Sequence, residues 1–184
     1  SGTVYNDLWS FNPATGGWTQ VTPSGTPPSA RWEHSLAYDP ANNEFVMFGG
    51  RNLAGTALTD TWVLTCSGAT TCSWATGGAG PSARYGHAMA YDPATARVVL
   101  FGGQSGATLL GDVWAWNGAS NTWSSVTPAG TAPSARVHPA LAQADKIVSG
   151  LLMFGGLDAG GVKNDAWLLS GAGGGSPQWQ TVTT

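Results

Sequence analysis

Short stretches of alternating or continuous apolar residues, separated by polar turns, run along this chain. His34–Tyr38 alternates between polar and apolar side chains and ends at the turn Asp39–Asn43. The next segment, Glu44–Phe48, is apolar after its first residue, as expected of a strand covered on both faces. Third and fourth strands are expected near Thr59–Leu64 and around Trp74, and no segment resembles a helix of useful length. The pattern predicts a unit of four short antiparallel strands.

This unit recurs through the chain at a fixed spacing. The tripeptide Phe-Gly-Gly begins at Phe48, Phe101 and Phe154, and each copy lies 53 residues after the one before. Units of this length, with four strands and two apolar faces, are typical of propeller blades, which bury those faces only by stacking on neighbouring blades. The sequence therefore predicts one all-β repeat domain with blades at residues 28–80, 81–132 and 133–184.

The first part of the chain supplies only half a blade. Residues 1–27 hold two outer strands, around Tyr5–Phe11 and Trp18–Val21, and a linker. The total is about three and a half blades, whereas closed propellers typically have four to eight. We therefore expect an open arc, a part of a longer propeller, or one piece of a ring assembled from several chains. Residues 18–31 match residues 123–136 at 10 of 14 positions, so two types of blade are expected to alternate.

Glycine pairs close the second strand of each unit, and tryptophans stand in the third and fourth strands. These landmarks resemble the kelch repeat over essentially the whole chain, with tryptophan where that family normally has a tyrosine or another aromatic on the third strand. The resemblance implies a kelch-type β-propeller and favours a bacterial-type secreted kelch protein or a fragment of one. The residues that carry it are Gly49, Gly50, Gly102, Gly103, Gly155, Gly156, Trp9, Trp62, Trp114, Trp167, Trp18, Trp74, Trp123 and Trp179.

Composition narrows the classes of partner. Only 9% of the 184 residues are charged, and the formal net charge is −3, which disfavours a nucleic-acid ligand. No stretch approaches the roughly 20 apolar residues that a membrane-spanning helix needs. Ser1 opens neither a signal peptide nor a basic targeting segment, so we expect a mature or excised soluble segment.

The two cysteines, Cys66 and Cys72, lie on the two arms of one outer hairpin. This placement allows a disulfide without bending the blade, and we expect one, with two free thiols as the alternative. No nearby histidine or acidic residue completes a metal site, so no metal is expected there. A disulfide implies an oxidising compartment and therefore an extracellular or periplasmic, secreted protein.

The polar residues that would first suggest catalysis recur from blade to blade. A repeated residue is more simply explained as part of the scaffold, so we expect the histidines to be packing residues at the start of the innermost strand, the aspartates to bond at the entry of the third strand, and the arginines to tie blades together. We expect no catalytic residue, metal or cofactor among them. The residues are His34, His87 and His138; Asp7, Asp60, Asp112 and Asp165; and Arg31, Arg84 and Arg136.

The residues that differ between blades point to a binding surface. The linkers between blades and the loops from second to third strand should share one face, with the short Asp-Pro turns on the other. Trp32 and Tyr85 are the best candidates for anchors, because exposed aromatics supply much of the contact energy at interfaces; covering the seams between blades is the alternative role. The predicted surface comprises Trp32, Glu33, Arg51, Asn52, Tyr85, Gln104, Val137 and Asp158.

Three hypotheses of function follow. The first is a binding or scaffolding module that presents this loop face to a protein or glycan. The second is a structural subunit that self-assembles through its incomplete blade into a ring or an extracellular fibre. The third, an enzyme of the galactose-oxidase-like class of kelch proteins, is disfavoured, because the copper site of that class needs two histidines and a tyrosine linked to a cysteine. Here both cysteines are expected to pair with each other.

Overall fold

The computed structural model describes residues 2–144, 149–172 and 176–183, and in these residues every regular element is a strand. The half blade consists of β1 (Leu8–Asn12) and β2 (Gly17–Val21). The full blades are β3 (Ser35–Asp39), β4 (Glu44–Phe48), β5 (Thr61–Cys66) and β6 (Cys72–Thr76); β7 (Ala88–Asp92), β8 (Arg97–Phe101), β11 (Val113–Asn117) and β12 (Thr122–Val126); and β13 (Ala140–Gln143), β14 (Leu151–Asp158), β15 (Gly161–Ser170) and β16 (Gln178–Val182). A two-stranded ribbon, β9 (Gln104–Ser105) and β10 (Thr108–Leu109), projects from the second full blade.

Each full blade is an antiparallel sheet with its strands in chain order. The apolar run expected over Glu44–Phe48 is β4, which lies between β3 and β5 and is covered on both faces. The expected first and third strands are also present, shifted by one or two residues toward the C-terminus. The all-β, kelch-type fold class that the sequence predicts is confirmed.

Apolar side chains between successive blades form the core. Phe48 on β4 and Leu100 on β8 belong to one cluster of buried side chains, and Phe101 on β8 and Met153 on β14 belong to another. Trp116 on β11 is fully buried in the first of these seams, where its indole nitrogen donates to Oε1 of Glu44 at 3.0 Å. Each seam is therefore built from residues of two blades, which is why one blade cannot be stable alone.

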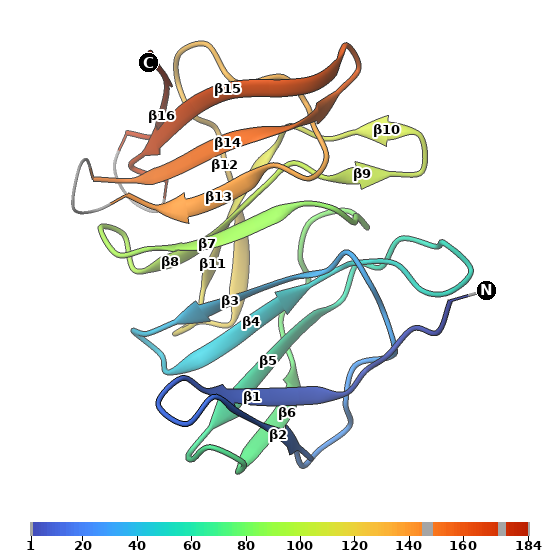
Figure 1. Cartoon of the computed structure of the whole chain (residues 1–184). Coiled ribbons are helices and arrows are strands. Elements are labelled where there is room, and N and C mark those ends of the chain that lie inside the picture. The colour runs from blue at the N-terminus through green and yellow to red at the C-terminus, as the bar shows by residue number, and fades with distance from the viewer. Residues whose placement is uncertain (1, 145–148, 173–175, 184) are drawn as a thin grey trace.

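The blades form an open arc, with the half blade at one end and the third full blade at the other (Figure 1). Exposure changes at the open end. Phe154 is 53% exposed, whereas its equivalents Phe48 and Phe101 have no exposed surface. The last blade therefore presents to solvent a face that the other full blades bury against a neighbour.

The residues described here include no helix that is both long enough and apolar enough to cross a membrane.

Candidate functional site

A buried arginine at the start of each full blade bonds to the aspartate that precedes the third strand. Arg84 donates from Nη1 and Nη2 to the two carboxylate oxygens of Asp112 at 2.7 and 2.8 Å, and from Nη1 to the Gly102 carbonyl at 3.0 Å. The indole nitrogen of Trp114 donates to Oδ2 of Asp112 at 2.7 Å. The pairs Arg31–Asp60 and Arg136–Asp165 have the same geometry, with Trp62 and Trp167 as the indole donors.

These hydrogen bonds keep the carboxylates ionised. Burial raises the pKa of Asp112, but hydrogen bonds from Arg84 and Trp114 outweigh it and the net pKa is lowered. The hydrogen bond from Arg136 is the main cause that lowers the pKa of Asp165 to about 2. The carboxylate oxygens of these aspartates therefore accept hydrogen bonds from arginine and tryptophan side chains of the scaffold.

The arginine connects blades through its backbone. The Arg84 carbonyl accepts from the Gly50 amide at 2.9 Å, and the Arg84 amide donates to the Leu58 carbonyl at 3.0 Å, both in the preceding blade. Gly50 needs a positive φ, 90°, for this contact. The side chain thus holds its own blade together while the backbone links it to the blade before.

The three histidines do not lie at equivalent positions, contrary to the expectation from their spacing. Ala140 faces Phe154 as Ala88 faces Phe101, so the residue before each alanine is equivalent: His87 in the second blade and Pro139 in the third. His138 comes one residue earlier, at a position where the backbone has a positive φ of 56°. It therefore projects at the surface and is not a packing residue.

His87 is the buried member of the set. Neither ring nitrogen has a hydrogen-bond partner among the described residues, and the Phe48 ring lies edge-on to it at 5.6 Å. Burial, then Arg84 and His34, lower the pKa of His87 to about 3, and the Phe48 carbonyl opposes this shift without reaching hydrogen-bonding geometry. The imidazole is neutral at physiological pH. Burial, followed by Arg31, also lowers the pKa of His34.

Four of the predicted surface residues meet around the axis of the arc. The Arg51 guanidinium lies 3.7 Å from the centre of the Trp32 ring and 4.4 Å from that of Tyr85. Its Nε faces Oε2 of Glu33 at 2.7 Å, off the line of a hydrogen bond but well within an ion pair, and Nη2 donates to Oε1 at 3.1 Å. His138 Nε2 lies 3.3 Å from the same Oε1. We call these five residues the axial cluster.

A backbone ladder places the axial cluster. Glu33, Gly86 and His138 occupy the second position after the three arginines, and all have positive φ, at 55°, 63° and 56°. The Gly86 amide donates to the Glu33 carbonyl at 2.9 Å, and the His138 amide donates to the Gly86 carbonyl. Three successive blades therefore converge at this point, and side chains far apart in sequence meet there.

The other four predicted surface residues have different surroundings. Val137 is 2% exposed and offers no binding surface, so its assignment to the surface is corrected. Asn52 bonds to the Thr56 amide and Gln104 to the Gly106 carbonyl, each inside its own loop. Asp158 accepts from Ser134 at 2.6 Å and faces Lys163 at 3.0 Å; Ser134, followed by Lys163, lowers the pKa of Asp158 to about 2.

Two exposed apolar loop tips were absent from the predicted surface. Leu53 is 70% exposed in the loop after β4, and Val162, the second residue of β15, is 87% exposed beside the turn from β14. Both loops lie with the β9–β10 ribbon on the right-hand side of Figure 1. Each of these residues follows a glycine pair by a few positions, and this spacing could have placed them in loops of the predicted face. Three loops of the same kind therefore project from one face.

Cys66 and Cys72 face each other across β5 and β6 and are joined by a disulfide bond. In the described part of the chain, no three histidine, cysteine, aspartate or glutamate side chains come together as a metal site.

Comparisons with known proteins give one consistent fold. A family model, the KLHDC2/KLHL20/DRC7 Kelch-repeats domain, matches residues 1–184. The solved structure of YjhT has a TM-score of 0.71 over 97% of this chain and 52% of its own, at 16% sequence identity, which shows a shared fold.

Curated relatives match over short parts of their own length. They include tRNA wybutosine-synthesizing protein 4 of Emericella nidulans, 32% identical over 79% of this chain and 14% of its own. Tip elongation aberrant protein 1 of Schizosaccharomyces pombe is 30% identical over 88% and 14%, and serine/threonine-protein phosphatase BSL2 of Arabidopsis thaliana is 32% identical over 85% and 15%. The chain thus spans about 14% of the length of the first two.

Proposed function

The chain belongs to the KLHDC2/KLHL20/DRC7 Kelch-repeats domain family, and from this membership we propose that it is a non-enzymatic module that binds a protein through its loop face. We define the loop face as the axial cluster together with the loop at residues 51–57, the β9–β10 ribbon and the β14–β15 turn. Rigid blades that hold loops of differing sequence are a common basis for recognition.

One observation carries this proposal: Arg51 packs between Trp32 and Tyr85, beside loops with exposed apolar tips. Trp32 is 44% exposed, and Leu53 lies near it on the border of one groove. Arginine, tryptophan and tyrosine are the residues most enriched where binding energy concentrates at protein interfaces. The ion pair with Glu33 already holds Arg51 in place beside the two rings, which reduces the side-chain entropy lost on binding.

The experiment compares proteins captured by the immobilised chain from its native source. The double variant Leu53→Lys/Val162→Lys adds two charges at the loop tips, and Ala41→Lys/Ala94→Lys adds the same charges at exposed Asp-Pro turns. We expect a specific protein to be recovered by the wild type and the second variant but at least about tenfold less by the first. Equal recovery by both variants contradicts the proposal, as does binding to a glycan array without any captured protein.

A second candidate function, self-assembly, is favoured by the exposed face of the last blade. Phe154 and Leu152 are 53% and 38% exposed there, and a second copy would cover them. Light scattering over a hundredfold range of concentration tests this candidate. A rising mass supports assembly into a ring or fibre, and a monomer throughout contradicts it.

We also propose that the protein is secreted, to an extracellular or periplasmic location, as a bacterial-type kelch protein. The Cys66–Cys72 bond supports this location because disulfides persist in oxidising compartments. The mass of the native protein, isolated with free thiols blocked, should rise by about 2 Da on reduction, from two added hydrogens. Two blocked thiols on the isolated protein contradict the proposal.

A further inference from the structure

The half blade contains two residues, an aspartate and a tryptophan, of a three-residue motif that an arginine completes in each full blade. Asp7 stands two residues before Trp9, and the indole nitrogen donates to Oδ2 of Asp7 at 2.7 Å. The equivalent distances in the full blades are 2.6 Å for Trp62, and 2.7 Å for Trp114 and Trp167. In each full blade an arginine also bonds to both carboxylate oxygens, whereas among the described residues nothing but Trp9 bonds to the side chain of Asp7.

The edge of the sheet beside Asp7 is also unpaired. In the full blades the third strand pairs on both sides, as β11 does with β8 and β12. Within the described residues β1 pairs with β2 alone. The half blade therefore lacks the two inner strands of a full blade. In the full blades the arginine lies just before the first of these inner strands.

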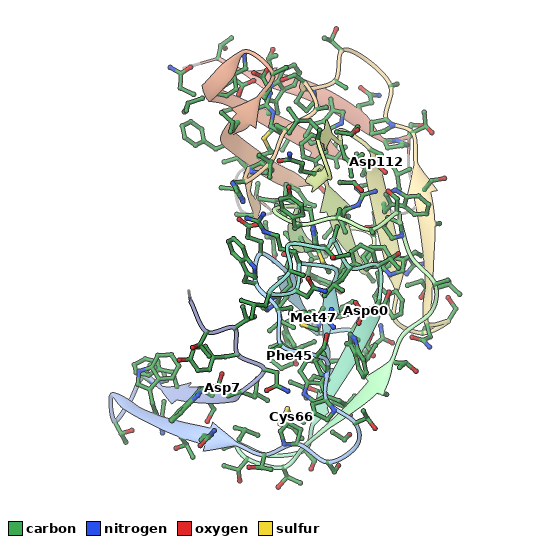
Figure 2. The ribbon with its side chains drawn as sticks, turned by 90° about the vertical axis from the view of Figure 1, so that its right-hand side faces the viewer. Asp7, Phe45, Met47, Asp60, Cys66 and Asp112 are labelled. Carbon is green, nitrogen blue, oxygen red and sulfur yellow. A yellow bond between two sulfur atoms is a disulfide. The ribbon has the colours of Figure 1, made fainter. Side chains whose placement is uncertain are left out.

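An apolar groove lies where those inner strands would pack. It has a volume of about 300 Å³ and runs between the half blade and the first full blade. Figure 2 shows Asp7 on the half blade and Phe45 on the neighbouring blade. Leu36 on β3 lines the groove and is 42% exposed, although Met89, its equivalent in the second blade, is buried. The residues that line the groove include Leu8, Trp9, Val21, Leu36, Phe45 and Leu64.

We propose that this edge is a binding site for one kind of partner, a two-stranded β-hairpin whose leading arginine forms a bidentate ion pair with Asp7. The other blades fix its register. Leu100 lies opposite Trp114 and Phe101 opposite Val113, so the second strand of the partner places an apolar residue opposite Trp9 and a phenylalanine opposite Leu8. Backbone hydrogen bonds give affinity, and Asp7 gives selectivity for the arginine.

The hairpin comes from outside residues 1–184. Each inner hairpin of this chain is already paired with its own outer strands, β4 with β5, β8 with β11 and β14 with β15. A second copy of these residues would have to open one of its own blades to donate a hairpin. A hairpin from outside these residues fills the edge at no such cost.

The test uses the whole chain and a fluorescent synthetic peptide that copies Pro81–Gly103, the inner hairpin of the second blade with its leading Arg84. We expect saturable binding by fluorescence anisotropy. The peptide variant Arg84→Gln should bind at least about tenfold more weakly, because charge-assisted bidentate bonds are lost. The peptide Arg97→Gln removes the same charge from the first residue of β8, beside the turn, and should bind within about twofold of the original.

The chain variant Asp7→Asn completes the cycle. Asparagine keeps an oxygen for the Trp9 indole but carries no charge, so Arg84→Gln should then have little further effect. Each of three results would overturn the proposal. These are an absence of saturable binding, equal weakening by the two peptide variants, and a loss of affinity on Arg84→Gln that is as large with the Asp7→Asn chain as with the wild type. Loop-tip variants leave this edge intact, so the result is independent of the proposed protein-binding function.

Discussion

Arg84 is fully buried, and the Asp112 carboxylate to which it bonds is partly exposed. Glutamine at this position is uncharged and too short to reach both Asp112 and the Gly102 carbonyl, which would lose the hydrogen bonds that Arg84 donates. We expect Arg84→Gln to lower the free energy of unfolding by about 2–4 kcal/mol, less than for a fully buried pair because water reaches Asp112. Urea unfolding measures this loss.

The matched control is Arg97→Gln. The Arg97 guanidinium bonds only to the neighbouring Ala96 carbonyl among the described residues, so its loss should change stability by about 0.5 kcal/mol or less. Similar losses for the two variants would contradict a structural role for the Arg84–Asp112 pair.

His87 couples stability to pH through its pKa of about 3 in the folded chain. An unfolded histidine binds its proton near pH 6.5, so between about pH 6.5 and 3 the unfolded state holds the extra proton. Stability is therefore complete above about pH 6.5 and falls as the pH is lowered, by up to about 1.4 kcal/mol per pH unit.

Urea unfolding between pH 7 and 4.5 measures this slope, because most carboxylates remain ionised in that range. We expect His87→Leu to flatten the curve, since leucine has no proton to bind and the ring nitrogens had no partners to lose. A slope that is the same in wild type and variant would show that His87 is not the titrating group.

Sequence spacing predicted the residues of the scaffold but misplaced one histidine. The distance from arginine to histidine is three residues for His34 and His87 and two for His138. Only strand register, with Ala140 opposite Phe154, shows that Pro139 takes the histidine position. Four members of the axial cluster belong to the predicted surface, but their contacts with one another and with His138 were not predicted, because they form only where three successive blades meet.

At the level of elements, apolar runs predicted strands well where both faces are covered. β4 has the predicted bounds Glu44–Phe48 because it is central in its sheet. β5 extends to Cys66 because pairing with β6, and not burial, sets its end. The ribbon of β9 and β10 was not predicted, since two residues per strand give no periodicity.

Successive blades approach closely at some glycines, so a substitution there should destabilise the fold. Gly102 has a φ of 71°, and a Cβ there would lie 2.7 Å from the Arg136 carbonyl of the next blade. Gly106 has a similar φ, 58°, with nothing within 4 Å. We expect Gly106→Ala to cost about 1 kcal/mol from the backbone conformation, and Gly102→Ala about 2 kcal/mol more from the collision.

Thermal or urea unfolding of the two glycine variants separates these contributions. Equal losses for Gly102→Ala and Gly106→Ala would mean that the blades do not approach as closely as the structure places them.

For the whole molecule, the repeat length predicted the number of blades, and the structure shows the consequence at the open end. Phe101→Ala should cost about 3–5 kcal/mol, because that ring is fully buried between two blades. Phe154→Ala removes the same ring from a half-exposed site and should cost about 1 kcal/mol or less in a monomer.

Unfolding of both phenylalanine variants at low protein concentration tests the open arc. A large loss for Phe154→Ala would contradict it, since that ring would then be covered by another blade or another copy.

The most direct test of the unfinished blade is amide hydrogen exchange. In the chain alone, we expect the amides of β1 to exchange orders of magnitude faster than those of β5 and β11, because β1 pairs on one side only. Addition of the Pro81–Gly103 peptide should then protect β1. Protection of β1 equal to that of β5 without the peptide, or no gain of protection with the peptide bound, would contradict the account.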